Sequence, residues 1–406
     1  MLATNTASIR PGTIGTVAGT GEPGHDGDGG PAIAACLNEP KNLALDSGGG
    51  LYIADSENHL VRKVDLNSGV ISTVAGLAGG ADESRRGEQA QRAPQAPTQE
   101  EDPFADPDPS GPERFAQLAD LSGTVRFTVG TAPGATHFHG DGAPAVTAML
   151  NFPSAVAVDN RNLYIADTMN HRVRRVDLET GVITTLAGTG QRRLSGDRGP
   201  AVAATLNEPC ALALDGKGSL YVADQSNHRV RRVNLEDGII TTIAGTGEAA
   251  YSGDGTPAVE ATLNGPSGLA IGQDGALYIA DTFNGRIRRI DPDTGLISTV
   301  VGDGGEYRYQ GHPNEFSTSL SRPYGIAVGR EGNILITDSD SHLIRSWDRN
   351  KRIIRLLAGN GLAQFSGDGL APSESSLNYP FGVAVDGRGN VYIADTFNHR
   401  IRMISA

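Results

Sequence analysis

Four histidines outside any repeated phrase are candidates for acid–base or metal chemistry: His25, His137, His139 and His312. The segment "HFH" places His137 and His139 two residues apart, on the same side of an extended chain, which is a spacing compatible with a metal ion. Because the sequence supplies no obvious third ligand, a divalent metal is an alternative that we do not favour. A role as general acid or base is the preferred interpretation.

A second set of candidates surrounds the proline that opens one short strand in each sequence repeat. The residues next to this proline differ from copy to copy, and they mix acidic, basic, aromatic and small side chains, which suits a ligand site but also ordinary channel lining. Together with the histidines, the predicted catalytic candidates are Lys41, His137, His139, Glu208, Arg322 and Tyr324. The predicted ligand-binding residues are Glu39, Phe152, Ser154, Cys210, Ser267, Tyr379, Phe381, His25 and His312.

An internal repeat defines the elements that must position these residues. The same aspartate of an "ADTxNHRVRRVD" phrase recurs six times, at Asp55, Asp167, Asp224, Asp281, Asp338 and Asp395. Within one copy, 211–215, 219–224, 228–235 and 238–245 are rich in β-branched residues and are separated by Gly, Asp and Asn, which predicts four short strands, here called a to d. Four antiparallel strands per copy predict an all-β, six-bladed propeller.

The two ends of the chain are complementary. The run at 13–19 is similar to a d strand without preceding a, b and c strands, whereas the last copy ends at 399–404 without a d strand. We expect the N-terminal strand to complete the C-terminal blade, which closes the ring and removes free sheet edges. Residues 1–406 are therefore predicted to form a single propeller domain.

One irregular segment interrupts the repeat between its first and second intact copies. Residues 79–112 are Pro-rich, charged and unpatterned, whereas 114–130 align with the c and d strands of other copies. We therefore expect an inserted segment over 77–122 with an extra c–d hairpin. It is either a flexible surface insertion or a lid at the loop-rich face.

The alternation of strand direction places the d-to-a and b-to-c connections on one face, whose mouth is the default binding site. Repetition separates scaffold from site, because a position that is identical in every blade holds the blade. The repeated Asp167, Asn170, His171, Arg172 and Arg174 are therefore interpreted as structural. The Gly-rich "SGDG" turns offer one carboxylate each, which is too few for calcium.

Composition limits the partners. A formal net charge of −13 disfavours a nucleic acid partner. Residues 1–11 lack the features of a signal peptide and no stretch of about 18 apolar residues occurs, so we expect a cytoplasmic protein without a membrane partner. The two cysteines, Cys36 and Cys210, define no disulfide framework. No Gly-rich phosphate loop precedes a helix, and no cofactor is predicted.

The phrases "AGTGxxxxSGDGxPAxxATLNxPxxLALD" and "LYIADTxNHRIRRVD" resemble the NHL-repeat family, in its bacterial stand-alone form, over all but about 77–112 of the chain. This resemblance implies six blades and a range of functions that includes protein scaffolds, RNA binders, lyases and lactone hydrolases. The predicted function is binding of a small molecule at the mouth, with non-redox lyase, hydrolase or isomerase chemistry. The alternative is a protein-interaction scaffold without catalysis.

Overall fold

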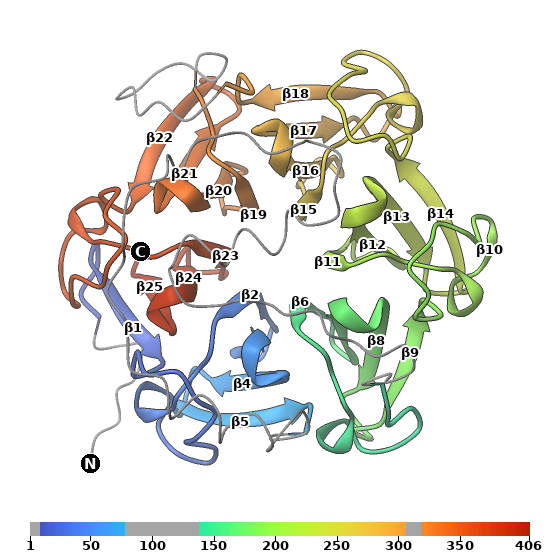
Figure 1. Ribbon diagram of the computed structural model, residues 1–406. Helices are drawn as coiled ribbons and strands as arrows, with labels where there is room; N and C mark the ends of the chain where they lie inside the picture. The colour runs from blue at the N-terminus through green and yellow to red at the C-terminus, as the bar shows by residue number, and fades with distance from the viewer. Residues whose placement is uncertain (1–8, 78–137, 306–317) are drawn as a thin grey trace, which may run out of the picture. The chain divides into compact units, whose positions relative to one another are not determined.

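The computed structural model describes residues 9–77, 138–305 and 318–406. They form six antiparallel sheets arranged around a central axis (Figure 1), which confirms the predicted six-bladed all-β propeller. The helical elements among these residues are 3₁₀ turns of three residues, and no helix in the described part of the chain could span a membrane.

Each blade runs from its innermost strand a to its outermost strand d. The first and second blades are β2 (Pro40–Leu45), β3 (Gly50–Asp55), β4 (Leu60–Asp65) and β5 (Val70–Ala75), then β6 (Pro153–Val158), β7 (Asn162–Asp167), β8 (Arg172–Asp177) and β9 (Ile183–Ala187). The third and fourth are β11 (Pro209–Leu214), β12 (Ser219–Asp224), β13 (Arg229–Asn234) and β14 (Ile239–Ala244), then β15 (Pro266–Ile271), β16 (Leu277–Asp281), β17 (Arg286–Ile290) and β18 (Ile297–Val301). The fifth is β19 (Pro323–Val328), β20 (Ile334–Asp338), β21 (Leu343–Asp348) and β22 (Ile353–Ala358).

The sixth blade joins both ends of the chain. Its strands are β23 (Pro380–Val385), β24 (Val391–Asp395), β25 (Arg400–Ile404) and, from the N-terminus, β1 (Ile14–Ala18). Strand β1 pairs with β25 in register from Ile14↔Ile404, and the Gly12 N–H donates to Ser405 O at 2.9 Å. The predicted closure of the ring by the N-terminal strand is confirmed.

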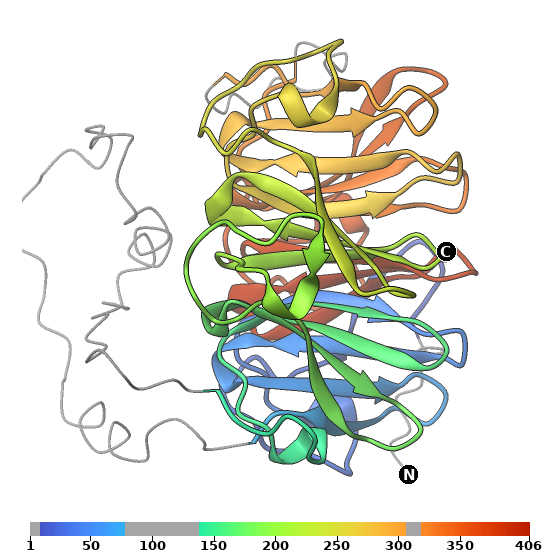
Figure 2. The same cartoon turned by 90° about the vertical axis from the view of Figure 1, so that its right-hand side faces the viewer.

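Short 3₁₀ turns recur at two places in the repeat: between strands b and c in all six blades, and before strand a in five of them within the described residues. The b-to-c turns are η3 (Ser56–Asn58), η5 (Thr168–Asn170), η7 (Gln225–Asn227), η9 (Thr282–Asn284), η10 (Ser339–Ser341) and η12 (Thr396–Asn398). The turns before the a strands are η2 (Ala32–Ala34), η4 (Ala145–Thr147), η6 (Ala201–Ala203), η8 (Ala258–Glu260) and η11 (Pro372–Glu374). Seen edge-on in Figure 2, the b-to-c turns lie on one side of the blades, and the tight a-to-b and c-to-d turns lie on the other.

Apolar side chains fill the spaces between blades because both faces of every sheet are covered by its neighbours. All residues of β3 and β16 are buried for this reason. The outer edges are covered as well, since the loop entering the second blade pairs with the blade's own outer strand. In that loop, the Gly142 N–H donates to Ile183 O at 2.8 Å and the Ala145 N–H to Gly181 O at 2.8 Å. In the third blade, β10 (Gly199–Pro200) pairs with β14 in the same way. This coverage blocks pairing with another chain.

The predicted lid and extra hairpin fall within 78–137 and lie outside the described residues.

Candidate functional site

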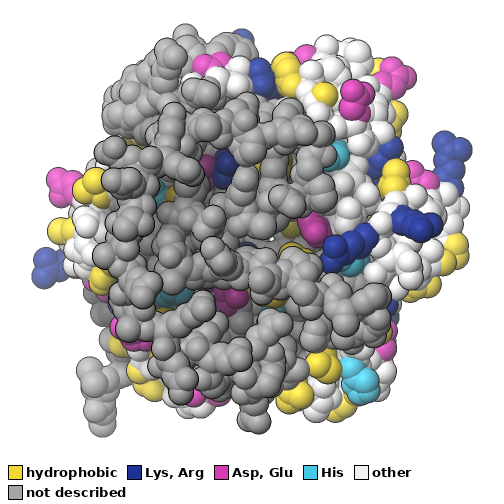
Figure 3. Space-filling view, in the orientation of Figure 1, with side chains coloured by type: hydrophobic (Ala, Val, Ile, Leu, Met, Phe, Trp, Pro, Cys, Tyr) yellow, Lys and Arg dark blue, Asp and Glu magenta, His cyan; other side chains and the backbone are white. Residues whose placement is uncertain are grey.

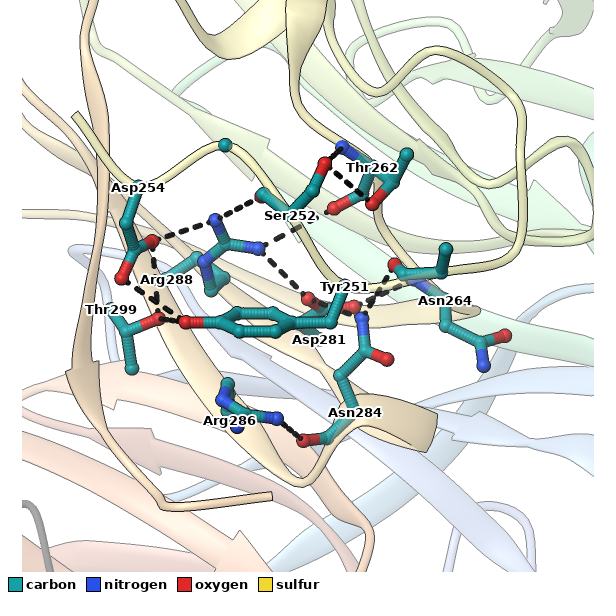
Figure 4. A network of polar contacts seen from close by, with 12 residues as sticks. Tyr251, Ser252, Asp254, Thr262, Asn264, Asp281, Asn284, Arg286, Arg288 and Thr299 are labelled. Atoms are coloured by element: carbon teal, nitrogen blue, oxygen red, sulfur yellow. Dashed lines mark hydrogen bonds and ion pairs between the residues drawn. The ribbon is translucent and has the colours of Figure 1, made fainter. Parts of the chain in front are cut away.

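A buried ion-pair network fixes the end of each blade that faces the mouth. In the fourth blade, shown in Figure 4, the Asp281 carboxylate accepts hydrogen bonds from the Asn264 N–H at 2.7 Å and from Asn284 Nδ2 at 2.8 Å. The fully buried Arg288 guanidinium lies 3.2 Å from Asp281 and 2.8 Å from Asp254 of the "SGDG" turn. The repeated aspartate and arginine therefore hold the loop to the blade.

The same pairing explains the "SGDG" turns. Their aspartate lies 2.6 to 3.0 Å from a buried arginine of strand c in four further blades, in the pairs Asp28–Arg62, Asp141–Arg174, Asp197–Arg231 and Asp368–Arg402. An aromatic ring often covers the arginines, as Tyr251 does in Figure 4, where its centroid is 3.7 Å from Arg286. These carboxylates are counter-ions of buried guanidinium groups, which supports the structural interpretation.

The repeated histidine joins one blade to the next at five of the six junctions between blades. Each of these histidines has a positive φ, between 50° and 57°, and its Nδ1 accepts the N–H of the residue before the next blade's proline at 3.0 to 3.2 Å. The pairs are His59–Phe152, His171–Glu208, His228–Gly265, His342–Tyr379 and His399–Glu39. Because an accepting Nδ1 is unprotonated, these imidazoles are neutral. Burial, helped by Arg192 and Arg172, lowers the pKa of His171 to about 4.

These contacts position the residues in front of the prolines. Glu39, Phe152, Glu208, Arg322 and Tyr379 have φ values between 48° and 55° and are half-buried at the opening of the innermost strands. A positive φ is unusual for residues with a side chain. In all of these cases except Arg322, the imidazole of the preceding blade holds the N–H; Gly285 replaces that histidine before the fifth blade.

The residues that follow the prolines mostly form hydrogen bonds with other residues of the propeller. The Ser154 and Thr168 hydroxyls are 2.5 Å apart, the Cys210 thiol donates to Pro266 O at 3.4 Å, and Ser267 Oγ accepts from Gln225 at 2.7 Å. Burial raises the pKa of the Cys210 thiol well above its usual value, so it is protonated at neutral pH. Cys210 and Ser267 thus join adjacent blades, and Ser154 does so through a 3.5 Å hydrogen bond from its hydroxyl to Cys210 O.

The two aromatic residues in this position stack on each other. The rings of Tyr324 and Phe381 have centroids 4.6 Å apart, and both side chains are buried. Burial also raises the pKa of the Tyr324 hydroxyl, with Cys210 and Glu208 adding to the effect. Tyr324 is therefore a neutral phenol at physiological pH rather than a base.

A cluster in the first blade combines two carboxyl groups with an amine. Burial raises the pKa of Glu57 to about 7; the ammonium of Lys41 lowers this pKa and the carboxylate of Glu39 raises it. Burial likewise raises the pKa of Glu39, against the effect of Lys41. Glu57 can therefore hold or release a proton near neutral pH, which is the property required of a general acid or base.

Glu57 was missed because it lies inside the b-to-c phrase that was interpreted as scaffold. Its position, the second residue of each 3₁₀ turn, nevertheless varies among blades: Glu57, Met169, Ser226, Phe283, Asp340 and Phe397. Variation within an otherwise repeated phrase was the available signal.

Other charged groups lie around the same mouth, where acidic and basic side chains lie close together (Figure 3). The Ser226 hydroxyl donates to Glu208 at 2.6 Å, and Arg322 lies 3.3 Å from Asp340. Burial raises the pKa of Asp340 to about 6, opposed by Arg322. The charges of Glu208 and Lys41 both act on Cys210, on the third blade. The structure thus places the predicted Lys41, Glu208, Arg322 and Tyr324 around one mouth.

The described histidines of the loops lie elsewhere. His139 is exposed and pairs with Met149 of its own loop, while the preceding Phe138 stacks on Arg172 of β8, the third strand from the axis. The backbone carbonyl of His25 accepts from Arg62, again on a third strand. His137 and His312 lie outside the described residues. Within 9–77, 138–305 and 318–406, no three His, Cys, Asp or Glu side chains converge as a metal site.

Two family models match the chain. The Teneurin NHL domain matches residues 3–88 and 246–316, and the NHL repeat matches 150–176 and 377–402. Among curated proteins, the chain is 30% identical over 270 residues to Protein SUPPRESSOR OF QUENCHING 1, chloroplastic, of Arabidopsis thaliana, covering 63% of this chain and 25% of that protein. It is 30% identical over 301 residues to NHL repeat-containing protein 2 of Bos taurus, covering 64% and 40%. The chain thus spans less than half the length of these relatives.

Solved structures share the fold at low identity. A protein of unknown function from Bacteroides thetaiotaomicron superposes with a TM-score of 0.62 at 18% identity, covering 96% of this chain and 75% of the other. An auxiliary nutrient binding protein from the same organism gives 0.59 at 15%, with the same coverage. A gluconolactonase from Xanthomonas campestris gives 0.50 at 13%, covering 91% and 86%. At these identities the similarity shows the fold alone.

Proposed function

We propose, for a chain that belongs to the NHL-repeat family of β-propellers, that the axial mouth binds a small polar molecule and acts on it by non-redox acid–base chemistry. The observation that carries this proposal is the cluster of Glu57, Glu39 and Lys41. A half-buried carboxyl with a pKa of about 7 beside an ammonium occurs in one blade, at positions where the other blades differ. Perturbed titratable groups of this kind gather at functional sites.

Each group has a role in this proposal. Glu57 takes or gives the proton, Lys41 orients an anionic or carbonyl oxygen, and Glu208 accepts a hydrogen bond from a ligand hydroxyl. Tyr379 and Phe397, whose ring centroids are 5.2 Å apart, offer an apolar wall. Mixed aromatic and polar linings are typical of small-molecule sites. That the fold is shared with a gluconolactonase and with nutrient-binding proteins supports a sugar acid, lactone or similar metabolite as the first class to test.

The test is a thermal-shift and calorimetric screen of sugar acids, lactones and amino acids, followed by turnover assays. We expect a ligand that stabilises the wild type to lose at least tenfold in affinity with Glu57→Gln or Lys41→Met. The matched controls are Glu179→Gln and Lys217→Met, exposed residues in turns of the opposite face. Equal binding by mouth variants and controls would refute the proposal.

A scaffold without catalysis is the second candidate. The second residue of the 3₁₀ turn before strand a is an exposed valine in three consecutive blades: Val146 (46%), Val202 (55%) and Val259 (48%). Repeated exposed valines suit a protein partner that spans several blades. This alternative predicts that no small molecule in the screen stabilises the chain.

A further inference from the structure

The c-to-d turn of the fifth blade differs from its counterparts in charge. The turns read "DLNSGV" at 65–70, "DLETGV" at 177–182, "NLEDGI" at 234–239 and "DPDTGL" at 291–296, whereas the fifth reads "DRNKRI" at 348–353. Arg349, Lys351 and Arg352 thus stand where the other blades have neutral or acidic residues. Arg355 of β22 likewise replaces a serine or threonine. Four basic residues are concentrated here in a chain of net charge −13.

Two of these arginines replace residues that have a clear structural role elsewhere. Arg352 has a φ of 54° at a position that is glycine, with φ from 69° to 73°, in the first four blades. A non-glycine residue in this conformation is strained. Arg349 replaces leucines that pack against the cores of three other blades, Leu66, Leu178 and Leu235. Neither arginine restores the packing or the turn conformation of the residue that it replaces, and Arg349 pairs instead with Asp274.

Both side chains line a cavity of about 280 Å³ between the fourth and fifth blades. The lining includes Arg289, Arg349 and Arg352, the hydroxyl residues Ser298 and Thr299, and Trp347, and it contains no carboxylate. Carboxylates lie close by, since Asp274 pairs with both Arg289 and Arg349, and Asp291 lies 3.0 Å from Arg289. They balance part of the charge and hold the guanidinium groups in place.

Arg289 also has an unfilled donor. Its counterpart in the third blade, Arg232, donates its Nε–H to Ser219 at 3.1 Å, but Ala276 occupies the position of that serine in the fourth blade. Arg289 Nε is buried and has no hydrogen-bond partner among the described residues, and the Arg289 side chain as a whole is 13% exposed. A buried donor without a partner is costly unless something else accepts from it. Six other arginines of the described blades have a buried Nε of the same kind, and Arg289 differs from them in lining this cavity.

We propose that this cavity is an anion site for phosphate or a small phosphate monoester. Arginine guanidinium groups bind phosphate oxygens through paired, charge-assisted hydrogen bonds, and the Ser298 hydroxyl adds a further donor. The Thr299 hydroxyl donates to Asp254 at 3.2 Å. The volume admits a single phosphoryl group with a short substituent. The site lies on the c-to-d turn side of the blades, opposite the mouth, and is independent of the chemistry proposed there.

The experiment is calorimetric titration of the full chain at low ionic strength with inorganic phosphate, glycerol 3-phosphate and citrate in turn. The variants are Arg352→Gly and Arg349→Leu, which restore the residues of other blades and so leave folding intact. Lys217→Gln, the same loss of charge in a turn on the same face, is the control. We expect saturable binding of phosphate or the monoester that weakens at least tenfold in each variant and is unchanged in the control.

The three ligands distinguish a phosphate monoester from free phosphate and test the alternatives to a phosphate site. Tighter binding of glycerol 3-phosphate than of inorganic phosphate would assign a monoester, and the reverse would assign the free ion. No saturable binding of either by the wild type, tighter binding of citrate than of both, or equal affinities in the wild type and both arginine variants would overturn the proposal. A circular-dichroism melt of each variant confirms that it is folded.

Discussion

The histidine contact between blades makes stability depend on pH in a calculable way. The buried His171, 3% exposed, accepts the Glu208 N–H through Nδ1, and its pKa is lowered from 6.5 to about 4. The unfolded chain therefore binds more protons than the native state between these values, and stability falls as pH drops from about 6.5 to about 4. At about 1.4 kcal/mol per pKa unit, the wild type loses about 2 kcal/mol from this group between pH 7.5 and pH 5.

The perturbation is His171→Gly, since Gly285 already occupies the equivalent position in the fourth blade, with a φ of 57°. At pH 7.5 we expect the variant to be less stable by about 3 kcal/mol, because the packing of the buried ring and its contacts with the Glu208 N–H and Arg192 Nε are lost while a positive φ is relieved. Urea unfolding at both pH values should show this gap narrow by about 2 kcal/mol at pH 5. Buried aspartates with raised pKa act in the opposite direction, but they are present in both proteins and cancel in the difference.

The control is Lys217→Gly, an exposed turn residue that does not titrate in this range. Its difference from the wild type should be the same at both pH values. A gap between wild type and His171→Gly that stays constant from pH 7.5 to pH 5 would refute the assignment of a neutral, accepting imidazole.

Three further outcomes follow from the described contacts. Asp55→Asn removes the fully buried counter-ion of the buried Arg62 and should lower the free energy of unfolding by about 3 kcal/mol, measured by urea unfolding. Asp28, the other counter-ion of Arg62, has a side chain that is 46% exposed, so Asp28→Asn should lower the same free energy by about 1 kcal/mol or less. If the mouth is catalytic, Glu57→Gln should abolish the limb of the pH–rate profile with a midpoint near 7; a surviving limb would assign it to another group. Deleting residues 1–18 removes β1 and exposes β25, so light scattering should detect self-association that the full chain lacks.

The sequence predicted the fold because its strands repeat at a fixed period and each copy carries its own turn residues. The phase of the repeated aspartate placed strand b, and the incomplete first and last copies predicted the closing strand. The conformation of the mouth could not be read in this way. A residue before proline normally favours extended backbone, whereas Glu208 has a positive φ and donates its N–H to His171 Nδ1 of another blade, which only the folded ring brings near.

The candidate site was predicted less well for a related reason. Lys41, Glu208 and Arg322 were found because they vary between blades, whereas Glu57 was hidden in a phrase that is otherwise constant. His139 was selected because it stood outside the histidine phrase, yet it occupies the position of Ser252 in the "SGDG" turn, near the third strand rather than the axis. Comparing the residues at equivalent positions of the six repeats therefore identifies candidate site residues better than asking whether a residue lies inside a repeated phrase.

That rule also identifies the fifth blade as the most specialised part of the ring. Gly285 replaces the histidine that would join the fourth blade to the fifth, and Arg349 and Arg352 replace a packing leucine and a turn glycine. Each change removes a contact or adds strain, and in the other blades the corresponding residues stabilise the scaffold. Because a propeller distributes the same contacts over six blades, it tolerates such losses in one of them. The interface between the fourth and fifth blades lacks these stabilising residues at both of its ends. Selection for binding rather than for folding is the simplest physical explanation of that loss.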